Sequence, residues 1–569
     1  MEGAQLRVRA SAPELPLSER SRVPFAQEMV VLTKQDHISL KWAARYWKAQ
    51  YHRVAAREAA LKRKIEAQQA HIRELTHRLY GKKSEKGVGT KLASAPSAKR
   101  RGQQPARPGH GRIVRPQLPV IEEVYEVPAE HRHCPACGMP YEEFPGTEDS
   151  QIVEVQVQAY IRRIKRKRYR KGCQCPSVCG MLTAPRAPRV LPKTSLGVSV
   201  WTAVLLDKYL SSRPTHRLCE DLRQHGVPLA QGTLTDGLRR LAPLFIPLVE
   251  ALHERQMSET VFHNDETRWA VFEEVAGKHG YRWYLWVTRS ASVVFYQMAA
   301  SRGAVVPKSH FAGRQALEVV VVCDRYSAYK CLATSQEGIL LAFCWAHVRR
   351  DFLDAAHSWP EWAAWMLAWV ADIRELYRLN AARLQVWDAA QSLPHQSQEF
   401  RDCQYELVNK LTQMKTRCDD QLQEQRLPSV KRKVLASLQR HWAGLLVFVE
   451  HPEVPMDNNA AERALRNPVT GRKNYYGSGR VWSAQLAATM FTVLQTVLLW
   501  GLNPRHWLQT FLDACAAHGG HPPPDLSGFL PWAMSAARKH QLSQPLPGSF
   551  PPLSRELSAP SPPHGTNTS

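Results

Sequence analysis

The segments TVFHNDETRW (260–269) and ALEVVVVCD (316–324) decide the fold that the sequence predicts. Both have the apolar patterning of a β-strand, and an aspartate, Asp265 or Asp324, stands where each apolar stretch ends. A carboxylate at the end of a buried strand is unfavourable unless it is paired, hydrogen-bonded or bound to a metal. Loops just past strand ends are common catalytic sites in open sheets. Each aspartate is therefore a candidate site residue.

The segments around these two extend the same pattern. GYRWYLWVTRSASVVFYQMA (280–299) and GILLAFCWA (338–346) alternate or run apolar, and a helix is expected from His347. Together they predict four or five strands of one mixed sheet, the first part of a core over 258–357. Residues 193–257 are expected to form a helical DNA-binding region with helix-turn-helix proportions, although any helical hairpin has these proportions. Residues 358–450 read as long helices without a strand signal.

A third carboxylate, Glu462, lies in DNNAAERALR (457–466), within the second core segment, 451–517. Asp457 can cap a helix here, and Pro468 is expected to end it. By spacing alone, a solvated Glu462–Arg466 pair explains the glutamate as well. The aspartates also have plain alternatives, a turn capped by Asp265 with Thr267 and a pair between Asp324 and Arg325 or a lysine.

The order of the elements favours a shared role for the three carboxylates. A mixed sheet with one Asp after its first strand, a second after a later strand and a Glu on a subsequent helix is a ribonuclease-H-like arrangement. Three carboxylates can hold two divalent metals about 4 Å apart, and such metals activate a nucleophile and stabilise a leaving oxygen. Hard oxygen ligands with room for water favour Mg²⁺ or Mn²⁺.

The N-terminal part predicts a long helix. Residues 41–81 hold no proline, and Leu61, Ile65, Gln68, Ile72, Leu75 and Leu79 are spaced as the seam of a short coiled coil. An amphipathic helix docked on its own protein explains the spacing equally well. Residues 1–40 are expected to be a disordered leader, and 82–120 a basic linker that adds phosphate affinity.

Residues 121–192 combine cysteines with a basic run. Cys134 and Cys137 can form half of a tetrahedral Zn²⁺ site, and the second half must come from Cys173, Cys175 and Cys179. Cys175 with Cys179 is our assignment, Cys173 is an alternative, and His131 or His133 could substitute. The intervening basic run predicts contacts with a DNA backbone: Arg162, Arg163, Lys165, Arg166, Lys167 and Arg168. A solvated face or a nuclear-type address explains the run as well.

The composition narrows the class of protein. The formal net charge is +25, which suggests a polyanionic partner. The longest largely apolar stretch, 490–502, is too short for a membrane span, and the N-terminus lacks the apolar region of a signal peptide. The twelve cysteines are therefore expected to be reduced. We expect a cytoplasmic protein that faces nucleic acid, with a disordered, proline-rich tail over 518–569.

Eight segments in order resemble the transposases of the bacterial insertion sequence 66 family, a DDE-type group, between about residues 61 and 512. The segments are RLYGKKSEK (78–86), RGQQPARPGHGR (101–112), CPACG (134–138), HNDETRW (263–269), CDRYSAY (323–329), CWAHVRRDF (344–352), DNNAAERALR (457–466) and GRKNYYGSG (471–479). The resemblance implies that Asp265, Asp324 and Glu462 form a catalytic metal-binding triad. It also implies a leucine-zipper-like helix, a zinc module and a helical insertion before the glutamate. The family usually has Cys-x-x-Cys in the second half of the zinc module, and this sequence departs from that pattern.

Two further groups near the triad are expected to act on DNA. His347 matches the family's Cys-x-x-His segment and could position the scissile phosphate or attacking water, although a satisfied core histidine explains it too. In the GRKNYYGSGR loop, Arg472 and Lys473 could bind phosphates while Tyr475 and Tyr476 stack on an unpaired base. A surface turn with buried tyrosines is the alternative.

The resulting expectation is a DNA transposase. It would bind the ends of its own element and a target, self-associate as a homo-oligomer with possible accessory proteins of the element, and localise to the nucleoid when bound. Hydrolysis at the element end would free a 3′-OH that attacks target DNA. Two rivals remain, a metal-dependent nuclease that does not join strands and an inactive end-binding protein derived from a transposase.

Overall fold

The computed structural model describes residues 31–80, 124, 126–128, 131–142, 157, 159–170 and 181–546 of the 569-residue chain. The chain divides into two compact units. One comprises 1–96 with 356–363, and the other comprises 97–355 with 364–569.

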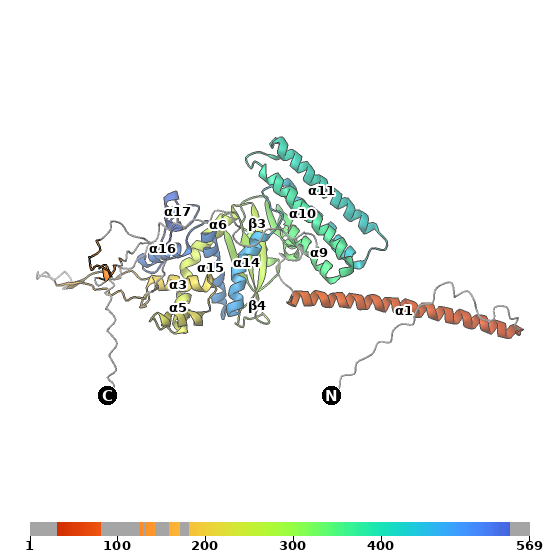
Figure 1. Cartoon of the computed structure of the whole chain (residues 1–569), viewed down its shortest axis with the longest axis horizontal. Helices are drawn as coiled ribbons and strands as arrows, with labels where there is room; N and C mark the ends of the chain where they lie inside the picture. Colours follow the sequence, from red (N-terminus) through yellow and green to blue (C-terminus); the bar gives the residue numbers. More distant parts are fainter. Residues whose placement is uncertain are drawn as a thin grey trace, which may run out of the picture. The chain divides into compact units, whose positions relative to one another are not determined.

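In the first unit, α1 (Lys34–Tyr80) is a single helix of 47 residues, drawn red in Figure 1. It begins seven residues earlier than expected, so the predicted disordered leader is wrong for residues 34–40. The apolar seam is exposed within this one chain, with Leu61, Ile65 and Ile72 each at least half exposed. The coiled coil therefore stays a prediction, because it concerns a partner.

The second unit is built on a five-stranded mixed sheet, which confirms the predicted fold class at that level. Its order is β5-β4-β3-β6-β7, where β3 is Val261–Ala270, β4 Arg282–Arg289, β5 Val294–Ala299, β6 Val319–Cys323 and β7 Ile339–Phe343. The β3–β4 and β4–β5 pairs are antiparallel, whereas β6 is parallel to β3 and to β7. The remaining strands, β1 (Arg168–Arg170) and β2 (Met181–Thr183), form a separate antiparallel ribbon.

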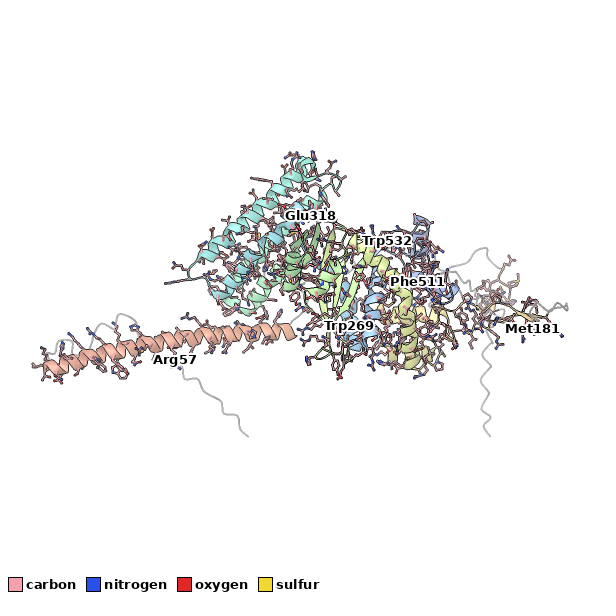
Figure 2. The ribbon with its side chains drawn as sticks, turned by 180° about the vertical axis from the view of Figure 1, so that it is seen from behind. Arg57, Met181, Trp269, Glu318, Phe511 and Trp532 are labelled. Carbon is pink, nitrogen blue, oxygen red and sulfur yellow. The ribbon has the colours of Figure 1, made fainter. Side chains whose placement is uncertain are left out.

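Helices cover both faces of this sheet. On one side α7 (Val305–Phe311) and α8 (Ser327–Ser335) pack with Phe262, Trp286 and Val321 in a buried cluster. On the other side, α14 (Asn459–Tyr475) and α15 (Val481–Leu499) lie against β3, β4 and β5 (Figure 1). Here a larger cluster includes Trp269 and Phe511, both labelled in Figure 2.

Helix α15 is apolar because it covers the sheet edge at β5. Thr496 and Thr492 are buried on it, and their hydroxyl oxygens accept hydrogen bonds from the backbone N–H groups of Val294 and Tyr296 at 3.1 and 2.8 Å. Edge-strand donors are thus satisfied by helix side chains. Within the described residues, α15 alone is long and apolar enough to cross a membrane, and 61% of that apolar window is buried inside the protein. The apolar sequence of α15 is therefore explained by its packing in the core of the protein.

The helices before the sheet form part of the same core. They are α3 (Val198–Tyr209), α4 (Thr215–Gln224), α5 (Gln231–Leu241), the 3₁₀ turn η3 (Ala242–Phe245) and α6 (Ile246–Met257). Gly237 on α5 lies against Trp201 on α3 so closely that a Cβ at this position would overlap the indole ring. The two helices with helix-turn-helix proportions, α4 and α5, therefore belong to a packed helical layer. DNA binding by α4 and α5 stays a prediction.

Between β7 and α14 the chain forms the expected helical segment. It comprises α9 (Trp345–Ser358), η4 (Pro360–Trp362), α10 (Ala363–Gln385), η5 (Leu393–His395), α11 (Gln398–Gln423), α12 (Ser429–Arg440) and α13 (Trp442–Glu450). Figure 1 shows α10 and α11 side by side, and Asp372 on α10 pairs with both Lys410 and Arg417 on α11. The last helix returns to the sheet, where Val447 packs with Val320 and Val322 of β6. Trp345 Nε1, at the start of α9, donates to Leu445 O on α13 at 2.8 Å.

The C-terminal segment corrects our expectation of a disordered tail from residue 518. After α16 (Pro504–Ala517), residues 518–546 are folded and include α17 (Ala536–Ser543). Phe529, Met534 and Leu542 from this segment are buried in the core cluster. The high proline content had led us to predict disorder despite these three apolar residues. The tail beyond 546 lies outside the described residues.

Candidate active site: carboxylates at the junction of β3, β6 and α14

The parallel pairing of β3 with β6 brings the two aspartates together. Val261, Phe262 and His263 are in register with Val320, Val321 and Val322. If that register is continued by two residues, Asp265 lies beside Asp324. We had expected Asp265 at the end of its strand. Instead, β3 continues past it, antiparallel to β4, as far as Ala270. The pairing with β6 ends earlier, so Asp265 stands at the point where β3 loses one neighbour.

Strand alternation decides which face each side chain occupies. Asp265 shares a face with His263, whereas Asn264 and Glu266 point to the opposite face. His263 contacts the start of α14, since its Nδ1 donates to Asn458 Oδ1 at 3.3 Å. Asp265 therefore faces the side covered by α14, the helix that carries Glu462.

Asn458 anchors the start of α14 and was missed by the sequence analysis. Its side chain is 1% exposed, and its Nδ2 donates to Asn264 O at 2.6 Å. Its backbone N–H donates to Cys344 Sγ at 3.2 Å. These bonds tie the helix to β3 and to the segment after β7. Asn458, rather than the expected Asp457, occupies the N-cap position, and Asp457 Oδ1 accepts from Asn459 N at 3.1 Å.

Helix α14 continues through Pro468, which we had expected to end it. A proline removes the N–H that would bond to the carbonyl four residues earlier. That carbonyl, Ala464 O, instead accepts a hydrogen bond from Tyr296 Oη on β5 at 2.7 Å. The sheet thus supplies the donor that the proline lacks, and the helix extends to Tyr475.

Electrostatics link the four candidate residues, which we call the carboxylate site: Asp265, Asp324, Glu462 and His347. Burial, together with the neighbouring carboxylates of Glu266, Asp324 and Glu462, raises the pKa of Asp265 to about 8. His347 Nε2 lies 3.6 Å from Glu462 Oε1. Burial lowers the pKa of His347, although Glu462 and Asp324 oppose this shift. The expected Glu462–Arg466 pair is not among the ion pairs of the described residues.

The residues present fit a divalent cation by their donor chemistry. Glu462 Oε1 and His347 Nδ1 are buried without a hydrogen-bond partner, and in the part of the chain that the structure describes no cationic side chain pairs with Asp265 or Asp324. Buried carboxylates without a counter-charge favour protonation or metal binding. However, within the described ranges no group of three or more His, Cys, Asp and Glu side chains is close enough to hold a metal ion. Side-chain rearrangement would be needed to form such a ligand set.

On the opposite face, Glu266 forms a separate buried network. Its side chain is 2% exposed, Arg302 Nη2 donates to its Oε1 at 2.6 Å, and Tyr329 Oη donates to its Oε2 at 2.8 Å. Tyr329 lies on α8, which follows Asp324, so the network connects both strands that carry the aspartates. The sequence analysis did not single out Glu266. The alternation of side chains along β3 could have indicated its separate role, since it places Glu266 and Asp265 on opposite faces.

Arg472 and Tyr475 lie in the last turn of α14 and have contacts within the protein, while their contacts with DNA stay a prediction. Arg472 Nη1 donates to Thr267 Oγ1 at 3.0 Å and also to Arg268 O, so this guanidinium connects α14 to β3. Tyr475 packs edge-on against Trp269 and burial raises the pKa of its hydroxyl, which makes it a core residue. Lys473 and Tyr476 remain exposed, Tyr476 by 75%.

The candidate zinc module is described in part. Cys134 N donates to Met139 O and Gly138 N to Cys134 O, which forms a tight turn between His133 and Pro140. Hydrogen bonds from the backbone N–H groups of Ala136 and Cys137 lower the pKa of the Cys134 thiol, and this favours the thiolate that Zn²⁺ requires. Cys173, Cys175 and Cys179 lie outside the described residues, so the ligand set stays a prediction.

The basic run 162–168 is exposed throughout. Arg166 Nε donates to Ala184 O at 2.7 Å and Arg168 lies in β1, so part of the run forms the β1–β2 ribbon. Contacts of these residues with DNA stay a prediction.

Comparison with known proteins identifies the family. A sequence model described as "Transposase IS66 family" matches residues 193–486, just over half of the chain and the whole carboxylate site. The chain belongs to the IS66 family of transposases.

Three relatives come from Sinorhizobium fredii (strain NBRC 101917 / NGR234). Uncharacterized protein y4jD is 25% identical over 77% of this chain and 84% of its own length. Uncharacterized protein y4hP is 24% identical over 63% and 66%, and uncharacterized protein y4qI is 29% identical over 58% and 61%. A solved structure, the Drosophila P element transposase strand transfer complex, matches at 13% identity and a TM-score of 0.31, covering 53% of this chain and 92% of that one.

Proposed function

We propose that this transposase cleaves DNA at the ends of its own element and joins the freed 3′-OH to target DNA, with Asp265, Asp324 and Glu462 as its catalytic carboxylates. The observation that carries the proposal is the register of β3 and β6. Continued by two residues, this register would align the two aspartates on the face that α14 covers, and the electrostatic effect of Glu462 on Asp265 supports a shared site. The strand order and this placement support a ribonuclease-H-like core.

The chain's own groups have distinct roles in this proposal. The three carboxylates would hold Mg²⁺ or Mn²⁺, which supplies activation of the attacking oxygen and stabilisation of the leaving 3′ oxygen. His347, held beside Glu462, orients that carboxylate and the phosphate next to it. Asn458 and the Glu266–Arg302–Tyr329 network hold the strands and α14 at fixed separations, because side chains locked by hydrogen bonds maintain a productive geometry.

In the proposed reaction, water attacks the phosphodiester at the element end and the bond to the 3′ oxygen breaks. The resulting 3′-OH then attacks a target phosphodiester, which forms a new phosphodiester bond as the target's own P–O3′ bond breaks and releases a target 3′-OH. The exposed basic run 162–168 and Lys473 bind DNA backbone, and Zn²⁺ at Cys134, Cys137 and two later cysteines stabilises the module that carries the run. Location in the cytoplasm and self-association through α1 belong to the same proposal.

A strand-joining assay tests the function. Purified protein is incubated with a labelled duplex that carries the element's own end, a target plasmid and Mg²⁺, beside an Asp324→Asn variant. Joined product with the wild type and none with the variant is expected. Cleavage without joining by the wild type would replace the proposal with a nuclease, and DNA binding without either reaction would favour an inactive end-binding protein.

Metal binding has a test that is independent of activity. Mg²⁺ or Mn²⁺ is expected to raise the melting temperature of the wild type, because ligands that bind the native state stabilise it. Asp265→Asn is expected to remove most of that rise. Equal metal-dependent rises in both proteins would place the metal elsewhere.

A further inference from the structure

Four side chains form a positively charged cluster where the core meets the helical insertion. We call it the α8–α12 cluster: Arg325 in the loop after β6, Lys330 on α8, Arg440 at the end of α12, and His441 between α12 and α13. The cluster was not predicted from the sequence, since Arg325 and Lys330 lie more than a hundred residues before Arg440 and His441.

Hydrogen bonds hold the two halves of the cluster together. Lys330 Nζ lies 2.7 Å from His441 Nε2, and His441 Nδ1 lies 2.7 Å from Ser437 O. A carbonyl oxygen only accepts, so Nδ1 carries the proton and the Nε2 lone pair accepts from the lysine. Arg325 Nη1 also donates to Ser437 Oγ at 3.1 Å. The neutral imidazole therefore orients the Lys330 ammonium without neutralising it.

The positive charge of the cluster is only partly balanced. Arg325 pairs with Asp351 at 2.7 Å. By contrast, over residues 181–546 no carboxylate lies within ion-pair distance of Lys330 or Arg440. Partial burial lowers the pKa of Lys330, and repulsion from Arg440 and Arg325 lowers it further. Two cations held near each other without an anion form a site suited to a phosphate.

The cluster lies close to the carboxylate site. Lys330 is on the first helix after Asp324, and the Asp324 carboxylate acts electrostatically on its ammonium. Arg440 is exposed, so it can reach a ligand on the surface. A DNA strand whose reactive phosphodiester lies at the carboxylates would present its neighbouring phosphates to Lys330 and Arg440.

We propose that Lys330 and Arg440 bind DNA backbone phosphates beside the reacting one, so that the helical insertion contributes directly to holding the DNA strand. The inference rests on the proposed function, and it assigns the insertion a role in substrate binding. The phosphates can belong to the element end or to the target, since both present the same chemistry.

The test is the salt dependence of DNA binding, measured by fluorescence anisotropy with the full chain. Two labelled duplexes are used, one with the element's terminal sequence and one with that sequence scrambled. The plot of log K against log salt has a negative slope, and each lost phosphate contact lowers the magnitude of that slope by about 0.9. Lys330→Gln and Arg440→Gln are each expected to lower the slope by about 1, and the double variant by about 2.

Two further variants separate a specific site from a change in net charge or in folding. Arg426→Gln removes an exposed arginine before α12, at the end opposite Arg440, and is expected to leave the slope unchanged. Arg440→Lys is expected to retain the slope of the wild type, because it keeps the charge at an exposed position.

The outcomes distinguish the alternatives. A lower slope with both duplexes, or with only one, supports the inference, and the duplex affected identifies the source of the phosphates. Unchanged slopes in the double variant, or an equal loss with Arg426→Gln, would overturn it while leaving strand joining intact. A wild type that binds neither duplex would overturn both this inference and the proposed function.

Discussion

At the scale of single residues, the carboxylate site combines buried charge with few partners. Asp265 is held where neighbouring carboxylates and burial raise its pKa to about 8, and Glu462 Oε1 is buried without a hydrogen bond. Such an arrangement is unfavourable for the stability of the protein alone and is typical of functional sites. By contrast, Glu266 nearby is satisfied by Arg302 and Tyr329. The two adjacent acidic residues therefore differ in role because they lie on opposite faces of β3.

Asn458→Ala is expected to lower both stability and joining activity. The substitution leaves Asn264 O without its donor, and an unsatisfied buried group costs about 1–3 kcal/mol in the free energy of unfolding. Because the start of α14 then loses the Asn458 side-chain bonds to β3, Glu462 is held less firmly and the rate of joining falls more than DNA binding. Denaturant titration and the joining assay measure the two effects. Asn409→Ala, at an exposed position on α11, is the control, and equal effects in both variants would contradict the anchoring role.

At the scale of elements, the sheet compensates for a proline inside α14. Tyr296 Oη donates to the carbonyl that Pro468 leaves without a partner. Tyr296→Phe is therefore expected to destabilise the protein by about 1–3 kcal/mol. In a Pro468→Ala background the backbone N–H returns, so the same tyrosine substitution is expected to be much less destabilising.

A double-mutant cycle measures this coupling by chemical denaturation. Tyr405→Phe, on an exposed tyrosine of α11, is the control for loss of a hydroxyl. Additive effects of the Tyr296 and Pro468 substitutions would show that the hydroxyl does not replace the missing donor.

Burial of His310 on α7 against α6 predicts that the free energy of unfolding falls in acid. Burial, together with the neighbouring His253, lowers the pKa of His310 to about 3. Its Nε2 lies 3.1 Å from Gln256 Oε1 on α6. The folded state therefore disfavours the charged imidazole, whereas the unfolded chain accepts the proton at its ordinary pKa near 6.5. The stability from the neutral form is complete above that pH and is lost as the pH falls from 6.5 towards 3.

The measurement compares the wild type with His310→Gln, whose amide can still donate to Gln256. From pH 7.5 to 5.5, the wild type is expected to lose about 1 kcal/mol more than the variant. Parallel pH profiles of the two unfolding free energies would rule out His310 as the source.

At the scale of the whole molecule, the sequence predicted the strands of the sheet better than the helix ends and the C-terminal segment, and the joint role of the carboxylates stays a prediction. Strand periodicity was sufficient for 260–269 and 316–324, and parallel pairing then aligned Asp265 with Asp324. The passage of α14 through Pro468 depended on a hydroxyl 172 residues earlier in the chain, which no local pattern contains. The folded segment 518–546 was missed because its prolines outweighed three isolated apolar residues that pack on the core. The α8–α12 cluster likewise exists only through tertiary contacts.

Self-association is expected to depend on α1. The seam residues are exposed within one chain, and two copies could bury them against each other. Ile65→Asp with Ile72→Asp is expected to shift the purified protein from an oligomer to a monomer in light scattering, while the core remains folded. The control is Lys64→Asp with His71→Asp, one residue from each seam position. Retention of the oligomer by the seam variant would contradict the coiled coil and favour a helix docked on its own chain.

The most direct test of the central claim is a metal-specificity switch at Asp324. The claim is that this carboxylate binds a catalytic divalent metal together with Asp265 and Glu462. Asp324→Cys replaces a hard oxygen ligand with a soft thiolate, which binds Mg²⁺ poorly and tolerates Mn²⁺ better. Strand joining by this variant is predicted to be lost with Mg²⁺ and partly restored with Mn²⁺, whereas Asp324→Asn remains inactive with either metal. Full joining by Asp324→Cys with Mg²⁺ would contradict the account.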